Sequence, residues 1–331
     1  MRKQRSLVLS NQVFVTTNKG KKFLAHRLTG NGIKSSPNLE SLLELFRSSK
    51  YKKNGIECIE QSSLQSTINL LRDLSFLIPS GIDEELDWLK KNGYLNNKST
   101  IESEHFIGFY KKTIAHAARE ITFFCDRVFV QLSRHLKYLG RYKPILYLCK
   151  SSNEFDLLFG KESPEWLTYF VLNKRILIVN FHLISRSDLY RSSIEESILH
   201  ELTHIFLGQT GCLIPIWLEE GVCEFFSKDS FFFNDKGRTN FLNKVWWFKE
   251  IELATKCNLL DIDCSTPDIN FAYMQSRFFV VFIAQLIGIK QLEHWIIETG
   301  LKENCYQVFF KIVGKTLEHV EIEWRKRMGV E

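Results

Sequence analysis

The sequence predicts an α+β fold that is mainly helical, with a small sheet, divided between two domains. The chain has 331 residues, a length that suits two domains better than one. Apolar residues recur at helical spacing over much of the chain after residue 100, which predicts helices there. Two apolar runs, 168–172 and 175–181, flank Asn173 and Lys174, and this pattern is typical of a β-hairpin.

A polar run from Asn96 to Ser99 predicts the boundary between a small domain, residues 1–98, and a larger one, residues 99–331. In the small domain we predict a hairpin made by Leu7 to Val15 and Phe23 to Arg27, helices over 39–47 and 63–74, a strand over 76–79 and a charged helix over 83–91. A hairpin followed by helices and a terminal strand indicates a winged-helix-like α/β module.

The small domain also carries most of the positive charge. Residues 1–54 hold twelve Lys or Arg and two Glu, a net charge of +10 in a chain whose total is +6. This excess favours an acidic partner, although a well-solvated surface explains it equally well. The order of elements resembles the PqqD-like peptide-recognition modules, which bind an acidic or amphipathic leader peptide along a strand edge. A helical cap over the larger domain is the alternative. Nucleic acid is not expected, because residues 39–46 are acidic and apolar.

The larger domain begins with a helical pattern from Glu102 to Leu139, followed by a strand over Pro144 to Cys149 and by the hairpin. Then comes an H-E-x-x-H motif, His200-Glu201-Leu202-Thr203-His204. Ser192 and Ser193 offer N-cap oxygens ahead of it, so a helix is predicted. Residues i and i+4 share one helix face, so both imidazoles can reach one Zn²⁺. Glu201 then lies where it can take a proton from water.

A second helix is predicted from Pro215, and Glu220 on it is the candidate third zinc ligand, sixteen residues after His204. Glu224 follows one turn later on the same face, where it either accepts a hydrogen bond from a ligand imidazole or is an ordinary surface residue. Glu219 is interpreted as a solvated helix residue. Cys223 is interpreted as a buried apolar residue rather than as a zinc ligand.

The motif at 200–204, followed by Pro215-x-Trp217-Leu218-x-Glu220-Gly221, resembles the gluzincin zinc metallopeptidases, and more closely their peptidase MA-like group. The strand and hairpin before the motif and the Tyr273-Met274-Gln275-Ser276 stretch after it are similar too, so the resemblance covers roughly residues 102–328. The group usually has a small Ala where this chain has Cys223.

This resemblance implies a mainly helical metallopeptidase domain with a small edge-stranded sheet and a Zn²⁺-dependent hydrolysis of a peptide bond. His200, His204 and Glu220 would hold the metal, Glu201 would act as general base, and Tyr273 would donate a hydrogen bond to the oxyanion. The strand from Arg175 to Phe181 would be an edge strand that pairs with an extended peptide or protein substrate. If the small domain binds the leader of a precursor peptide, the hydrolysis would mature that precursor.

Two other classes of function stay open. The first is a catalytically weak peptide-binding scaffold, which the complete set of metal ligands disfavours, and the second is a winged-helix regulator with a metallopeptidase-like sensor domain. The eight cysteines are dispersed and form no C-x-x-C pair, which favours reduced thiols and a cytoplasmic location. No apolar run approaches the ~20 residues of a transmembrane helix. The pattern predicts no particular oligomeric state and does not separate an endopeptidase from an aminopeptidase.

Overall fold

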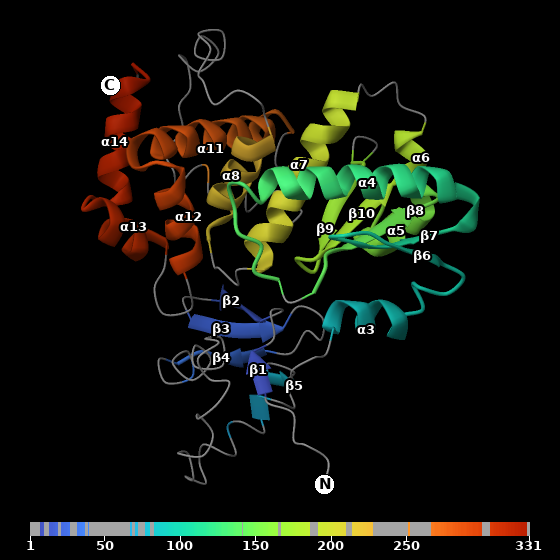
Figure 1. Ribbon diagram of the computed structural model, residues 1–331. Coiled ribbons are helices and arrows are strands. Elements are labelled where there is room, and N and C mark those ends of the chain that lie inside the picture. The colour runs from blue at the N-terminus through green and yellow to red at the C-terminus, as the bar shows by residue number, and fades with distance from the viewer. Residues whose placement is uncertain are drawn as a thin grey trace. The chain divides into compact units, whose positions relative to one another are not determined.

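The structure is a computed structural model of the chain (Figure 1). It describes residues 7–9, 13–18, 21–26, 32–36, 39, 67, 70–71, 77–79, 83–140, 142–164, 167–185, 191–209, 214–227, 251, 266–299 and 305–329. The chain divides into two compact units, the first ending at Asn96 and the second beginning at Asn97. Both helices and strands occur in each unit, so the α+β class is confirmed.

The first unit contains two small antiparallel sheets and one described helix. Strand β1 (Leu7–Leu9) pairs with β5 (Leu77–Pro79), and β2 (Val13–Asn18), β3 (Lys21–His26) and β4 (Gly32–Lys34) form a three-stranded sheet. Helix α3 (Glu84–Lys91) begins after Asp83, whose side chain accepts a hydrogen bond from the Leu86 amide at 3.1 Å.

These elements confirm part of the prediction for the small domain. The hairpin is β2 and β3, and the strand over 76–79 and the helix over 83–91 are also present. The expectation that Leu7 to Val15 is one strand is wrong, because Leu7–Leu9 pairs with β5 instead of with β3. The helices predicted over 39–47 and 63–74 fall almost wholly outside the described residues.

The second unit is organised around a mixed five-stranded sheet of order β6-β7-β8-β10-β9. Its strands are β6 (Ser99–Glu102), β7 (Ile107–Tyr110), β8 (Ile145–Cys149), β9 (Tyr169–Leu172) and β10 (Ile176–Asn180). Strands β7, β8 and β10 are parallel, while β6 and β9 are antiparallel to their neighbours and form the two edges. The predicted hairpin is therefore confirmed, but its second strand is not an edge strand, because β10 is paired on both sides.

Both faces of this sheet are covered, which explains why its central strands are apolar throughout. Every residue of β8 and β10 is buried. Leu146 and Leu148 belong to the same core as α4 and α7, whereas Tyr147 points to the other face, where its hydroxyl donates to Glu154 of helix α5 (Ser152–Phe159) at 3.1 Å. Strands buried on two faces lose the alternation of apolar and polar residues.

The helix predicted from Glu102 to Leu139 is shorter than expected. Residues 99–110 form the β6–β7 hairpin, a 3₁₀ turn η2 follows at Lys112–Ile114, and α4 extends only over Ala115–Leu132. Gly108 permits the close pairing of the two strands, since a Cβ there would lie 2.5 Å from Cγ2 of Ile101.

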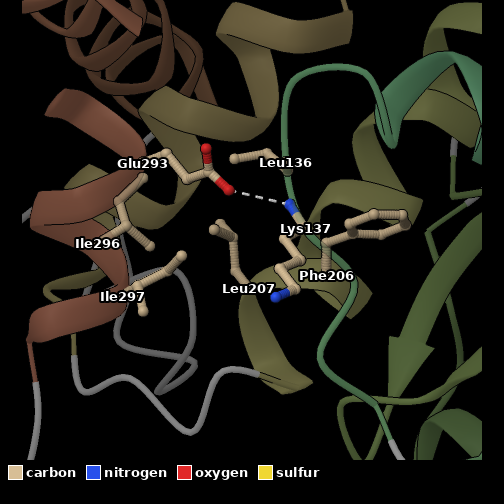
Figure 2. Close-up of a pocket in the computed structure, with 7 residues that line it drawn as sticks. All are labelled: Leu136, Lys137, Phe206, Leu207, Glu293, Ile296 and Ile297. Atoms are coloured by element: carbon tan, nitrogen blue, oxygen red, sulfur yellow. Dashed lines mark hydrogen bonds between the residues drawn. The ribbon is translucent and has the colours of Figure 1, made fainter. Parts of the chain in front are cut away.

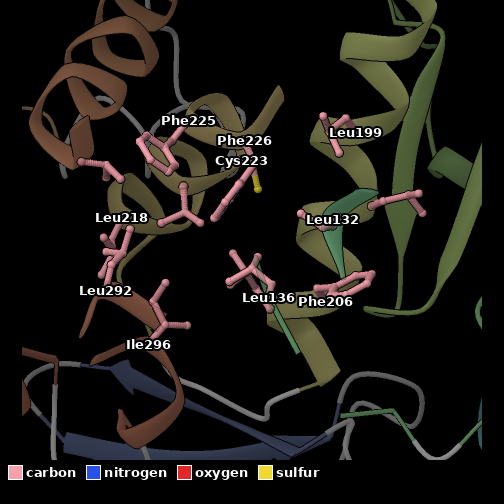
Figure 3. Packing of buried hydrophobic residues seen from close by; sticks show 14 of the residues in the cluster. Leu132, Leu136, Leu199, Phe206, Leu218, Cys223, Phe225, Phe226, Leu292 and Ile296 are labelled. Atoms are coloured by element: carbon pink, nitrogen blue, oxygen red, sulfur yellow. The ribbon is translucent and has the colours of Figure 1, made fainter. Parts of the chain in front are cut away.

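The helices stack beside the sheet in succession. They are α6 (Phe181–Ile184), α7 (Arg191–Gln209), α8 (Ile216–Ser227), α11 (Thr266–Ile287), α12 (Ile289–Glu298), α13 (Cys305–Val313) and α14 (Leu317–Arg327). Helix α7 packs on β9 and β10, α8 packs on α7, and α11 packs on α8 (Figure 1). One shared hydrophobic core joins them (Figure 3). Among the described helices none alone has the length and hydropathy to cross a membrane, and only the pair α11 and α12, bent by 110°, meets that test together.

Helix α7, which carries the H-E-x-x-H motif, is described from Arg191 onward. Ser192 and Ser193 therefore lie within the helix rather than at an N-cap position ahead of it. At its other end, Gln209 donates a hydrogen bond from Nε2 to the carbonyl of Lys174 at 2.8 Å. Gly208 lies so close to the hairpin turn that a Cβ there would be 2.6 Å from Cβ of Lys174. The turn between β9 and β10 thereby anchors the end of α7 to the sheet.

Candidate metal centre

Helix α7 separates its core side chains from its metal-binding candidates. Leu202 and Ile205 are buried in the core, and the Thr203 hydroxyl donates to the Leu199 carbonyl at 2.7 Å, so it is satisfied within the helix. His200 and His204 lie one turn apart and remain partly exposed. Their Nε2 atoms lie 3.2 Å from each other. The i, i+4 spacing therefore brings both imidazoles to one point.

Helix α8 brings the carboxylate of Glu220 to the same point. Its Oε2 atom lies 3.4 Å from Nε2 of His200 and 3.5 Å from Nε2 of His204. With the 3.2 Å between the imidazoles, the three atoms form a nearly equilateral triangle. Tetrahedral ligands at about 2.0–2.1 Å from one Zn²⁺ lie about 3.3–3.4 Å apart. The three donors therefore fit a single zinc ion.

A carboxylate contacts the outer nitrogen of each imidazole. Nδ1 of His200 lies 3.2 Å from Oε1 of Glu224, and Nδ1 of His204 lies 3.0 Å from Oε1 of Glu219. A carboxylate only accepts, so each Nδ1–H donates, and Nε2 is the ring atom that could bind a metal once it has given up its proton. Glu219, whose side chain is 35% exposed, is therefore more than the solvated residue that we expected, because it contacts His204. Glu224 contacts His200, the arrangement that the first of its two predicted roles needs.

The charges of this cluster favour a cation between the three donors. Burial alone would lower the pKa of His200, but the carboxylates of Glu220 and Glu224 outweigh it and raise that pKa to about 9. The pKa of His204 is likewise raised against burial by Cys223, Glu220 and Glu219. Burial would raise the pKa of Glu220, but the two imidazoles hold it well below its ordinary value. A divalent cation would be stabilised by the same field.

Glu201 follows His200 directly on α7 and is close enough to His200, His204 and Glu220 to feel their charges, but it is not one of the three corners. Burial raises the pKa of its carboxyl, the charges of His200 and His204 oppose that shift, and Glu220 adds to it. A carboxyl whose pKa lies closer to neutrality takes and releases a proton more readily at neutral pH. The placement and the direction of the shift both suit a general base.

Helix α11 packs closely on α8 next to Glu220. A Cβ on Gly221 would lie 2.7 Å from the carbonyl oxygen of Ser276, so only glycine lets the two helices approach this closely. Tyr273, partly exposed, lies on α11 three residues before Ser276. Arg277, which the sequence pattern did not single out, also belongs to α11 and lies near Glu224. Burial lowers the pKa of its guanidinium, and the charge of Glu224 opposes that shift.

Cys223 lies at the border between this cluster and the core. Its side chain is buried among apolar residues of α7, α8 and α12, as expected (Figure 3). Its Sγ atom nevertheless lies within 4.8 Å of ring nitrogens of His200 and His204, so that these three residues form a group that could hold a metal ion.

A separate small pocket lies between α7, α12 and the segment after α4 (Figure 2). Its lining consists of Leu136, Lys137, Phe206, Leu207, Glu293, Ile296 and Ile297. The only polar contact drawn in it is the Lys137 amide donating to Glu293 at 3.1 Å. It shares no residue with the triangle, so we assign the chemistry to the cluster around His200.

Comparison with known proteins adds no relative: no protein-family model matches the chain, and no curated protein matches it. The chemistry of the cluster is therefore inferred from its own geometry.

Proposed function

We propose that the protein is a zinc-dependent peptidase of the gluzincin type, which hydrolyses a peptide bond. The observation that carries this proposal is the triangle of His200 Nε2, His204 Nε2 and Glu220 Oε2, with sides of 3.2–3.5 Å. Two imidazoles and one carboxylate, with one position left for water, form a donor set that catalytic zinc sites use. The carboxylates behind both imidazoles support it, since ligand histidines usually have such partners.

Each residue of the cluster has a role in the proposed reaction. A bound Zn²⁺ would act as a Lewis acid and make water a stronger nucleophile at neutral pH. Glu201 accepts the proton of the attacking water and passes it to the leaving amine. Tyr273 donates a hydrogen bond to the developing oxyanion. Glu219 and Glu224 keep the two imidazoles oriented.

The partner that the first unit favours is an acidic peptide, such as the leader of a precursor. The support is the net charge of +10 on residues 1–54. The full chain should bind a labelled peptide rich in Asp and Glu, and the affinity should fall as salt is added. The same peptide with Asn and Gln in place of its acids is the matched control. Equal affinity for both peptides would exclude a charge-based role.

The experiment that tests the peptidase proposal separates metal binding from turnover. The purified chain should contain about one Zn²⁺. Glu201→Gln should keep that metal but lower turnover on a mixed peptide library by roughly 10²–10⁴-fold, because the amide cannot take a proton. Glu195→Gln, at a partly exposed residue of α7 that pairs with Arg127 at 3.5 Å, is the control that should change neither. Absence of zinc uptake would overturn the site, and zinc without hydrolysis would indicate a metal-binding scaffold.

A further inference from the structure

We propose that Cys223 is a fourth, displaceable ligand of this metal site, so that the resting site is closed by the protein and opens when the sulfur leaves. The inference rests on the proposed zinc site and goes beyond it, because it assigns a regulatory state to that site.

The position of Cys223 on α8 allows it to act together with Glu220. Cys223 follows Glu220 by three residues, and residues i and i+3 of a helix lie on neighbouring parts of one face. Pairs of ligands at this spacing, such as Glu-x-x-His, hold one metal centre in helical bundles. The Sγ atom lies within 4.8 Å of nitrogens of both His200 and His204, which bracket the same point from α7.

Burial explains why a thiol at this border would reach the metal rather than solvent. The Cys223 side chain has no exposed surface, and Figure 3 shows it among the core side chains around Phe226 and Leu218. A small apolar residue would fill the same volume. A cysteine adds a soft sulfur donor within 4.8 Å of the imidazole nitrogens, and Zn²⁺ accepts sulfur as well as nitrogen and oxygen.

Ligation by Cys223 would change both the affinity and the activity of the site. A tetrahedral zinc would have four positions, and His200, His204 and Glu220 would fill three of them. If the sulfur of Cys223 filled the fourth, its thiol would give up its proton and the place of the attacking water would be taken. If the sulfur left, it would take a proton back and water could enter. The closed form would bind zinc more tightly, and only the open form would hydrolyse a substrate.

X-ray absorption at the zinc edge of the full, zinc-loaded chain tests this directly. We expect one sulfur neighbour at about 2.3 Å together with nitrogen and oxygen neighbours at about 2.0–2.1 Å. The sulfur neighbour should vanish in Cys223→Ala. It should persist in Cys125→Ala, because Cys125 is a buried cysteine of α4 that does not belong to the group of possible metal ligands. A shell of nitrogen and oxygen alone in the natural chain would overturn the inference, as would a sulfur that persists in Cys223→Ala.

Two further readouts extend the test beyond one variant. In competition with a chelator, Cys223→Ala should bind zinc about 10–100-fold more weakly, whereas its turnover per bound zinc should rise, because the water position is always open. Cys223→Ser keeps the size of the side chain and replaces Cys223→Ala if the alanine chain does not fold. Sulfur ligation without any hydrolysis would leave this inference standing and remove the proposed function. Hydrolysis by a zinc-loaded chain with no sulfur neighbour would support the proposed function and overturn this inference.

Discussion

His204 is held at both of its ring nitrogens by two consecutive residues of α8. Oε1 of Glu219 lies 3.0 Å from Nδ1, and Oε2 of Glu220 lies 3.5 Å from Nε2. Neighbouring residues of a helix point about 100° apart, so they can meet one ring in this way only when the ring lies alongside the helix. The packing of α8 on α7 provides that arrangement, and it sets the orientation of the His204 ring.

The first prediction concerns Glu219. Glu219→Ala should weaken zinc binding by about 10–100-fold, because the Nδ1–H of His204 loses its acceptor and the ring loses its orientation. Glu219→Gln should lose less, since the amide oxygen still accepts that hydrogen bond. Competition with a coloured chelator gives both affinities. Glu195→Ala is the control on α7, and an unchanged affinity in Glu219→Ala would show that α8 packing alone orients His204.

Spacing along the chain was enough to predict His200, His204 and Glu220 as neighbours. The i, i+4 rule and the length of a helix return are local geometry, and Figure 1 shows α7 and α8 side by side as that reasoning requires. Glu219 was missed because the residue next to a ligand points away from it on an isolated helix. A signal was present, however: two ligand imidazoles need two outer acceptors, and Glu219 and Glu224 are the carboxylates available on the same helix.

The errors in the sheet have a different cause. The pattern of Ile107 to Tyr110 contains apolar residues that fit a helix and a short strand alike. Its partner β8 begins at Ile145, and this distant pairing decides the outcome. Likewise, β10 is an inner strand only because β8, some thirty residues earlier, pairs with it in parallel. The periodicity of apolar residues predicts whether a segment is a helix or a strand better than it predicts which strands will pair with it.

The second prediction concerns Tyr273 of α11. Tyr273→Phe should keep zinc occupancy at the level of the natural chain, because the hydroxyl is not one of the proposed ligands. Turnover should fall by about 10²–10³-fold, the usual cost of losing one oxyanion donor. Occupancy and turnover are measured on the same samples. Tyr94→Phe, in the first unit, is the matched control, and full activity in Tyr273→Phe would remove this residue from the mechanism.

The third prediction concerns the contact of α8 with α11. Gly221→Ala should lower the free energy of unfolding by about 1–3 kcal/mol, because the new methyl group would overlap the Ser276 carbonyl oxygen and the Val280 side chain. Urea unfolding followed by circular dichroism measures the loss. Gln291→Ala, at an exposed position of α12, should change stability by less than about 0.5 kcal/mol. A fully stable Gly221→Ala would mean that the two helices separate easily, and its zinc affinity should then drop instead.

The last prediction concerns a buried ion pair behind the sheet. The carboxylate of Glu154 accepts hydrogen bonds from the Lys150 amide at 2.9 Å and from the Tyr147 hydroxyl at 3.1 Å, and it pairs with the ammonium of Lys98, whose side chain is only 1% exposed. Burial would raise the pKa of Glu154, but these three partners outweigh it and lower that pKa below its ordinary 4.5.

A carboxyl group whose pKa is lower in the folded state stabilises the protein above its unfolded pKa, and this stabilisation disappears as the pH falls through the folded-state value. Glu154→Gln should therefore lower the free energy of unfolding by about 2–3 kcal/mol at neutral pH, because it leaves the buried Lys98 without a counter-charge. The difference from the natural chain should shrink as the pH falls below 4.5 and through the lowered folded-state pKa, where the natural carboxyl becomes protonated as well. Glu102→Gln is the matched control: its bridge to Lys143 at 2.8 Å is exposed and should contribute less than about 1 kcal/mol at any pH. A pH-independent loss in Glu154→Gln would mean that the side chain acts through its hydrogen bonds and packing rather than through its charge.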